Sequence, residues 1–351
     1  TEKILEFLGG HSGSEPWFGY VAYTAPHWPL QVPDGWLERH KGRYDEGYDL
    51  LRAHRVEKAL ALGVMPPNAS LEGFAATAAP WNSLEPEAQR RYARAQEVYA
   101  SMVEFLDHEV GRIVEHLKQT GQLERTVILF MSDHGASATE LGIVSGPTGL
   151  PPHFELALAR SDNSFENIGR QRSFVDHGRG FAEAATAPFR LFKGTLNEGG
   201  IRAAAFVHYP ELGQQGEINK TFLTVMDVLP TFLELGKTEH PGLVEYGGRT
   251  LQAIKGRSFL GVLYGETDTI RGSEDAVGWF LRGRGALVRG KYKLTNQPRD
   301  GRYVQHTSSR PWYLYDLVSD PGETRDLAAE HPEIVADMRV EWERDWQDQH
   351  R

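Results

Sequence analysis

Three short, nearly continuous apolar runs occur along the chain, at residues 17–24 (WFGYVAYT), 126–132 (TVILFMS) and 202–209 (RAAAFVHY). Runs of this length and composition are typical of strands that are buried on both faces, as in a parallel sheet. The sequence therefore predicts three strands of one central sheet.

A long stretch between the first two runs has the helical period. From about Glu87 to Thr120 the apolar side chains recur at steps of three and four, and Gly121 follows as a stop signal. Strands separated by long helical crossovers predict an α/β fold with a mostly parallel central sheet flanked by helices. In such sheets, functional side chains collect beyond the carboxyl ends of the strands.

The pattern changes near residue 265. Short β-like pieces at 277–280, 285–289, 292–294 and 312–316 are separated by Gly, Pro and Asn, and a helix is predicted from about Pro332 to Trp346. We therefore expect two domains. Residues 1–264 would form the large α/β part, and residues 265–351 a small α+β domain that contains an antiparallel sheet.

Composition narrows the choice of function. The formal net charge is −10, which argues against a nucleic-acid partner, and the apolar runs are too short to cross a membrane. There are no cysteines, so neither disulfides nor thiolate chemistry is available. The first eight residues, TEKILEFL, read as the tail of an amphipathic helix with no initiator Met. We expect a segment upstream of Thr1.

His27 follows the first apolar run, between Pro26 and Pro29. An imidazole at the carboxyl end of a strand could bind an anion or give a proton to a leaving oxygen. The structural alternative is a histidine that holds its loop by a hydrogen bond.

Asp133 and His134 follow the second run, directly before Gly135. A carboxylate and an imidazole in sequence can both face a divalent cation. The alternative is an Asp that caps a helix beside an incidental His. The dipeptide alone does not distinguish between the two interpretations.

Lys193 precedes a glycine-rich stretch that leads into the third run. Its ammonium could enter an oxyanion pocket. Glu198 and Arg202, further along, are expected to pair with each other or with the backbone and so hold the turn.

The order and the amino-acid sequences of these segments resemble those of the sulfatase family. The histidine segment is Tyr23-Thr-Ala-Pro-His-Trp-Pro-Leu-Gln31, the metal segment is Ser132-Asp-His-Gly135, and the lysine segment runs from Leu191 to Arg202. The tail, with Asp320-Pro-Gly-Glu-Thr-Arg-Asp-Leu327, is similar to the close of the family's small C-terminal domain. These sequences are most similar to those of arylsulfatases of bacterial and fungal type.

The resemblance implies an alkaline-phosphatase-like fold and hydrolysis of a small sulfate ester. In that family a formylglycine attacks sulfur beside a divalent cation, usually calcium. Asp133 and His134 match the second pair of metal ligands. His27 and Lys193 match residues that contact the sulfate and its leaving oxygen.

Two departures from the family pattern keep alternatives open. The pair reads Asp-His where many arylsulfatases have Asp-Asn, which makes Mn²⁺ or Zn²⁺ possible beside Ca²⁺ and allows a phosphonate monoester or phosphodiester hydrolase. The chain also contains no Cys and no Ser-x-Pro-x-Arg, so the formylglycine would lie upstream of Thr1. A third alternative is a non-catalytic, truncated homologue.

The first prediction concerns residues 1–351 expressed alone. A sheet buried on both faces that lacks neighbouring strands leaves apolar surface in water, at a cost of about 25 cal/mol per Å². We expect an aggregating product that does not turn over an aryl sulfate, measured by a thermal melt and a hydrolysis assay. A cooperative melt with metal-dependent sulfatase activity would contradict this expectation.

Overall fold

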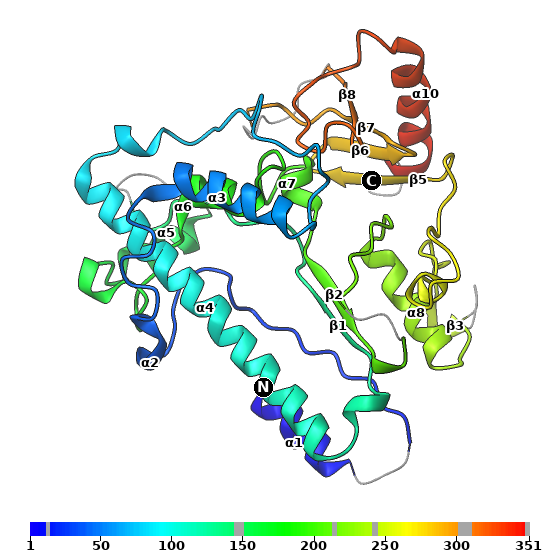
Figure 1. Cartoon of the computed structure of the whole chain (residues 1–351), viewed down its shortest axis with the longest axis horizontal. Coiled ribbons are helices and arrows are strands. Elements are labelled where there is room, and N and C mark those ends of the chain that lie inside the picture. The colour runs from blue at the N-terminus through cyan, green and yellow to red at the C-terminus, as the bar shows by residue number, and fades with distance from the viewer. Residues whose placement is uncertain (12–14, 144–150, 213–215, 241–244, 301–310, 348–351) are drawn as a thin grey trace.

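The long helix α4 (Pro86–Gln119) and a four-stranded antiparallel sheet occupy opposite parts of the molecule in Figure 1. The computed structural model describes residues 1–11, 15–143, 151–212, 216–240, 245–300 and 311–347. The other helices are α1 (Glu2–Gly10), α2 (Asp34–Leu37), α3 (Gly47–Ala61), α5 (Pro152–Ala159), α6 (Gly178–Thr186), α7 (Glu198–Ile201), α8 (Val228–Leu235), α9 (Leu260–Leu263) and α10 (Pro332–Trp342). The strands are β1 (Ile128–Met131), β2 (Ala205–His208), β3 (Glu245–Tyr246), β4 (Arg249–Thr250), β5 (Ala276–Leu281), β6 (Arg284–Arg289), β7 (Tyr292–Thr295) and β8 (Tyr313–Asp316).

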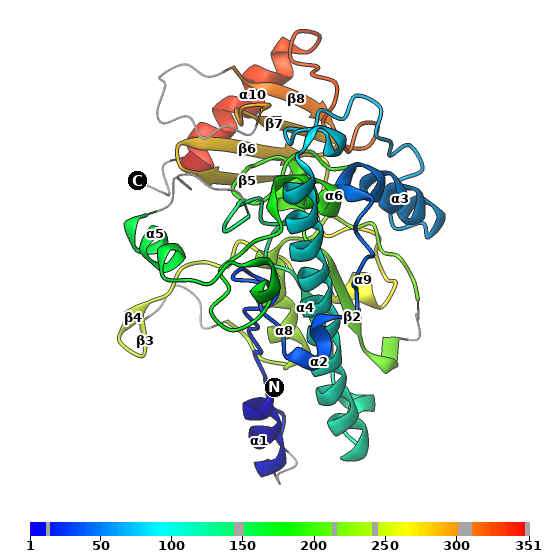
Figure 2. The same cartoon turned by 90° about the vertical axis from the view of Figure 1, so that its left-hand side faces the viewer.

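Helix α4 confirms the helix predicted from the apolar period. Pro86 stands in its first turn, where a missing N–H costs nothing, and Gly121 follows the C-cap with a φ of 66°. Its buried side chains Tyr92, Val98 and Met102 belong to a large apolar cluster. Figure 2 shows α4 running along most of the molecule's height.

Aromatic rings fill the upper part of this cluster, where α3 packs against α6. Phe181 is 1% exposed, and its ring centroid lies 5.5 Å from that of Tyr48 and 5.9 Å from that of Trp81. A Cβ on Gly180 would lie 2.3 Å from the Tyr48 ring, so only glycine allows the two helices to come this close.

Strands β1 and β2 lie within two of the three predicted runs, but they pair antiparallel, with Met131 opposite Ala205 and Ile128 opposite His208. The mostly parallel central sheet is therefore not confirmed. Within the ranges given above, parallel pairing is limited to one isolated bridge between Gln31 and Gly169. Helical crossovers predict parallel strands, but β2 runs antiparallel to β1.

The strand predicted at residues 17–24 is wrong. This stretch carries no strand assignment, and Phe18 and Tyr20 are 71% and 84% exposed. Its aromatic side chains contact neighbouring helices and turns instead. The Phe18 ring packs edge-on against Phe232 of α8, and the Trp17 indole N–H donates to Gln122 at 3.0 Å. A strand needs a paired neighbour, and here the pairing is missing.

The C-terminal sheet has the order β5-β6-β7-β8, and every neighbouring pair is antiparallel, as predicted. Side chains on its two faces alternate along each strand. Leu287, Leu294 and Leu314 pack with Met338 and Trp342 of α10, which covers one face. The boundary expected at residues 264 and 265 stays a prediction.

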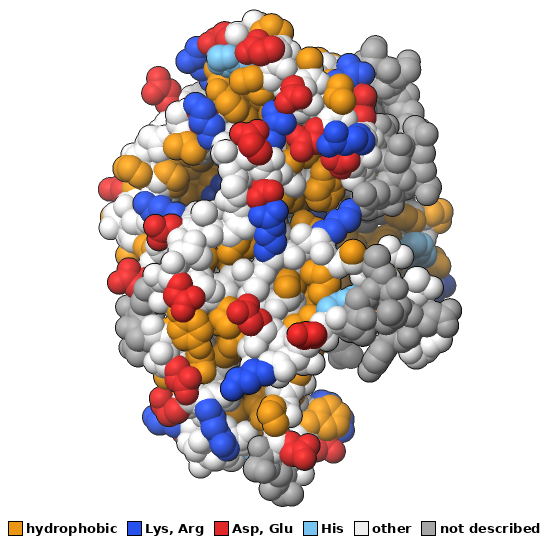
Figure 3. All heavy atoms as spheres, turned by 90° about the vertical axis from the view of Figure 1, so that its right-hand side faces the viewer, with side chains coloured by type: hydrophobic (Ala, Val, Ile, Leu, Met, Phe, Trp, Pro, Cys, Tyr) orange, Lys and Arg blue, Asp and Glu red, His pale blue; other side chains and the backbone are white. Residues whose placement is uncertain are grey.

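The surface carries mixed charge. On the face seen in Figure 3, acidic and basic side chains are interspersed between apolar patches. Within the described ranges, no helix combines the length and the apolar character that crossing a bilayer requires.

The second prediction tests the aromatic core. Phe181→Ala should destabilise the protein by about 3–5 kcal/mol, because it removes a fully buried ring and leaves a cavity. Phe7→Ala, at a residue that is 69% exposed, is the matched control and should change stability by about 0.5 kcal/mol or less. Urea unfolding of the complete gene product measures both. Equal shifts for the two variants would contradict the packing described here.

Candidate active site

Backbone hydrogen bonds continue beyond the β1–β2 ladder and join the predicted metal segment to the lysine segment. The N–H of Ser132 donates to the carbonyl of Ala204 at 2.9 Å, and the N–H of Gly135 donates to Gly200 at 3.1 Å. The N–H of Lys193 in turn donates to the carbonyl of Ala136 at 2.9 Å. Because β2 runs antiparallel to β1, the residues that follow β1 lie beside those that precede β2.

Two glycines permit close backbone contacts here, one between the two segments and one within the lysine segment. A Cβ on Gly135 would lie 1.8 Å from the carbonyl oxygen of Gly199. A Cβ on Gly199 would lie 2.1 Å from the carbonyl oxygen of Leu191. Real Cβ atoms do not approach backbone so closely, so both positions require glycine.

The structure brings His27 and Lys193 together. Lys193 Nζ lies 2.9 Å from His27 Nε2, across 166 residues of sequence. The other ring nitrogen, Nδ1, lies 2.7 Å from the carbonyl oxygen of Trp28 and donates to it. This bond leaves Nε2 as the acceptor for the Lys193 ammonium. The pair is exposed, so an incoming anion can reach both groups.

The loop that carries His27 is tied to residues 169–175. The N–H of Leu30 donates to Val175 at 3.0 Å, and the Gln31 side-chain amide donates to the carbonyl of Ser173 at 2.7 Å. Leu30 itself is fully buried. The histidine is therefore presented from an anchored loop rather than a free one.

Asp133 and His134 lie together directly after β1. His134 Nε2 is 3.1 Å from Asp133 Oδ2, and His134 Nδ1 donates to the carbonyl of Gly135 at 2.8 Å. The Asp133 side chain is 82% exposed and that of His134 33% exposed. Among the described helices, neither side chain acts as a cap, which is the structural alternative named above.

These two side chains fit a divalent cation as part of its ligand shell. The Gly135 hydrogen bond fixes the His134 tautomer and leaves Nε2 with its lone pair, beside a carboxylate oxygen. A calcium ion takes six to eight oxygen ligands. Over the described part of the chain, no cluster of three or more His, Cys, Asp or Glu side chains could hold a metal. Further ligands would have to come from elsewhere.

A buried polar cluster next to residues 137–139 was not predicted from the sequence. Asp176 is 1% exposed and accepts hydrogen bonds from Ser137 at 2.7 Å and from Thr139. His177 Nε2 lies 2.9 Å from the carbonyl oxygen of Ser137, and its Nδ1 lies 2.8 Å from the Gln96 side-chain amide of α4. Burial lowers the pKa of His177. The cluster fixes residues 137–139, just beyond Asp133 and His134.

The glycine-rich lysine segment is also held from its far side. Glu198 accepts from Arg202 Nε at 2.9 Å, which confirms the pairing expected within the turn. It also accepts from Lys293 of the C-terminal sheet at 2.8 Å, a contact that sequence spacing did not indicate. The sequence offers no signal for this contact beyond the presence of Lys293 in the short β-like piece at 292–294.

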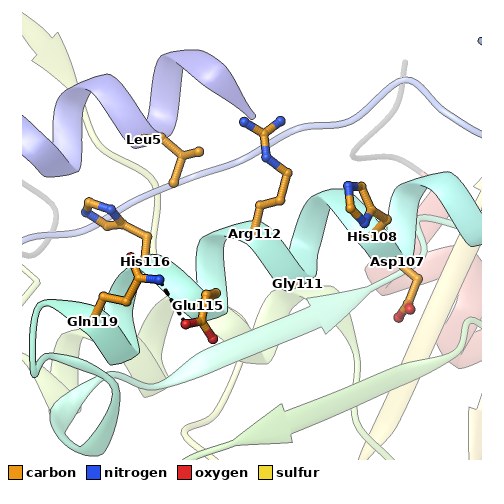
Figure 4. Close-up of a pocket in the computed structure, with 8 residues that line it drawn as sticks. All are labelled: Leu5, Asp107, His108, Gly111, Arg112, Glu115, His116 and Gln119. Carbon is orange, nitrogen blue, oxygen red and sulfur yellow. Dashed lines mark hydrogen bonds between the residues drawn. The ribbon is translucent and has the colours of Figure 1, made fainter.

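A separate hollow of about 530 Å³ lies between α1 and α4. Figure 4 shows Leu5 of α1 facing Arg112 and His116 of α4, with Gln119 bonded to Glu115. Arg112 is already paired with Glu2 and Glu109. None of the four predicted site residues lines this hollow.

Comparison with known proteins identifies the family. A family model described as Sulfatase matches residues 1–238, and the chain belongs to the sulfatase family. An uncharacterized sulfatase from Schizosaccharomyces pombe is 38% identical over 346 residues, which cover 97% of this chain and 60% of that protein. An arylsulfatase from Klebsiella aerogenes is 35% identical over 221 residues, covering 63% of this chain and 46% of that protein. The chain thus spans about half to three-fifths of the length of these relatives.

The fold is similar to that of solved structures. The phosphonate monoester hydrolase of Agrobacterium radiobacter has a TM-score of 0.52 and 16% identity, with 100% of this chain and 60% of that chain covered. The likeness shows a shared fold.

The third prediction tests the close backbone approach. Gly135→Ala should destabilise the protein by about 1–3 kcal/mol or more, because the new methyl group meets the Gly199 carbonyl. Gly111→Ala is the matched control. No atom lies within 4 Å of its Cβ position on α4, so alanine should stabilise the helix by about 0.5–1 kcal/mol. Thermal unfolding of both variants is the measurement, and a neutral Gly135→Ala would contradict the described geometry.

Proposed function

We propose that this chain is part of a sulfuric ester hydrolase of the arylsulfatase type that acts on small sulfate esters. The observation that carries the proposal is the 2.9 Å contact between Lys193 Nζ and His27 Nε2. The backbone of the same lysine is bonded to the segment that holds Asp133 and His134. Membership of the sulfatase family and the similarity to an arylsulfatase support the choice of sulfate esters.

The two catalytic residues suit the charge that develops in this reaction. When the S–O bond of a sulfate ester breaks, the leaving oxygen becomes an alkoxide or phenoxide. An ammonium at Lys193 stabilises that negative charge without rearrangement at the moment of reaction. In this proposal, the proton that Lys193 Nζ shares with His27 Nε2 is the one transferred to the leaving oxygen.

Asp133 and His134 would hold part of the shell of a divalent cation, with Ca²⁺ favoured by the family and Mn²⁺ or Zn²⁺ by the imidazole. When bound, such a cation supplies Lewis-acid stabilisation of the sulfate oxygens. The nucleophile in this proposal is a formylglycine that lies upstream of Thr1. In this proposal, residues 1–351 bind the substrate anion and protonate its leaving group.

A phosphonate monoester or phosphodiester hydrolase is the second candidate. The Asp-His pair and the fold shared with a phosphonate monoester hydrolase favour it. Both substrates are anionic esters with an oxygen leaving group, so the same Lys193 and His27 pair could serve either one. Relative rates decide between them.

The fourth prediction uses the complete gene product with 4-nitrophenyl sulfate. Lys193→Ala should lower kcat by about 10²–10³-fold, because an electrostatic contact to the developing charge is lost. His27→Ala should lower kcat/KM by about 10²–10⁴-fold, with the largest effect on substrates whose leaving group is a poor one. Lys3→Ala and His108→Ala, at exposed residues, are the matched controls and should leave both constants unchanged.

Three further arms separate the alternatives. Chelation should abolish activity, and re-addition of Ca²⁺, Mn²⁺ or Zn²⁺ in turn identifies the metal. A higher kcat/KM for 4-nitrophenyl phenylphosphonate than for the aryl sulfate would favour the second candidate. No turnover of either ester by the complete protein would leave the third alternative, a non-catalytic homologue.

A further inference from the structure

Lys293 is a fully buried lysine in the C-terminal sheet. It stands on β7 with 0% exposure, opposite Tyr315 of β8 and Val288 of β6. The next residue, Leu294, packs toward α10, so Lys293 points to the other face of the sheet. On that face its Nζ lies 2.8 Å from Glu198 Oε1 and 2.8 Å from Glu323 Oε1.

Glu323 holds the start of α7 through its second oxygen. Glu323 Oε2 accepts from the side-chain amide of Asn197 and from the backbone N–H of Glu198, both at 2.9 Å. Glu323 is 0% exposed and has a φ of 54°, in the left-handed region that few non-glycine residues adopt. Lys293 therefore forms ion pairs with Glu198 of α7 and with Glu323. Glu323 in turn accepts a hydrogen bond from the α7 backbone.

Other C-terminal residues hold the chain between Lys193 and α7. Arg284 Nη2 donates to the carbonyl of Gly194 at 3.3 Å, and the N–H of Leu196 donates to Gln297 Oε1 at 3.3 Å. Arg284 and Gln297 are themselves bonded at 2.7 Å. Contacts at residues 194, 196, 197 and 198 thus come from one sheet and the turns beside it.

The charges in this cluster depend on one another. Two buried carboxylates, Glu198 and Glu323, face the two cations Lys293 and Arg202. Burial raises the pKa of Glu323, and the Lys293 ammonium opposes that rise. Removal of one partner from such a cluster leaves a buried charge without compensation, which displaces the groups around it.

We propose that Lys293 is a positioning residue for Lys193. It fixes the first turn of α7 against the C-terminal sheet, and thereby sets where the lysine segment carries its ammonium relative to His27. This inference rests on the proposed function, in which Lys193 contacts the substrate anion.

The test compares four variants of the complete gene product, Lys293→Arg among them. Lys293→Met keeps the length of the side chain and removes its charge, and Glu323→Gln weakens the same cluster more gently. Arg289→Met is the matched control. Arg289 lies on the neighbouring strand β6, and its two ion pairs go to Asp337 and Glu341 of α10, on the opposite face of the sheet from Lys293.

Each variant is followed by thermal unfolding, hydrogen exchange of residues 190–202, and kcat, KM and the pH profile on 4-nitrophenyl sulfate. Lys293→Met should raise exchange in residues 190–202 and lower kcat by roughly 10- to 100-fold, because a misplacement of about 1 Å costs on the order of 100-fold. KM should change less than kcat, and Lys293→Arg, which restores the charge, should recover part of the loss. Arg289→Met should lower the melting temperature without either effect.

Clear outcomes overturn the inference. If Lys293→Met or Glu323→Gln alters exchange and kcat no more than Arg289→Met does, Lys293 only stabilises the fold. Should Lys293→Met fail to fold, Glu323→Gln decides by the same measurements. If wild type turns over no ester, the proposed function fails, whereas the exchange result still tells whether Lys293 holds the lysine segment.

Discussion

The antiparallel pairing of β1 with β2 is the constraint on which the site depends. In a parallel pair, the residues before β2 would lie at the opposite end of the sheet from those after β1. Because the pair is antiparallel, Met131 faces Ala205, and the backbone bonds continue through Ser132 and Gly135. The metal segment and the lysine segment therefore share one end of the sheet. The close contact also explains why glycine stands at position 135, where the two backbones meet.

Side chains complete what the backbone pairing begins. On one side, the buried residues His177 and Asp176 fix the residues that follow the metal segment. On the other side, Lys293 and Glu323 fix the residues that follow Lys193. A catalytic group needs supporting contacts to hold it within a fraction of an ångström of its working position. Both supporting clusters are buried, where hydrogen bonds and ion pairs are strong when complete and costly when broken.

Local patterns predicted the local elements well. The period of three and four gave helix α4 to within a residue, because Pro86 and Gly121 mark its ends in any tertiary setting. The short β-like pieces after residue 265 became an antiparallel sheet. Strand direction and pairing could not be read in the same way. An apolar run such as residues 17–24 favours a buried strand but does not tell which partner pairs with it, and here Phe18 and Tyr20 are exposed.

The candidate site shows the same division between local and long-range information. His27, Asp133, His134 and Lys193 stood out because each is a reactive side chain near a predicted strand end or in a glycine-rich turn. Their supporting residues carry no such mark, since Lys293 and His177 acquire their partners only through contacts between distant segments. Lys293 lies 95 residues from Glu198, and His177 lies 81 residues from Gln96. A buried lysine requires compensating carboxylates. The buried charge of Lys293 is therefore the feature that links the C-terminal sheet to the candidate site.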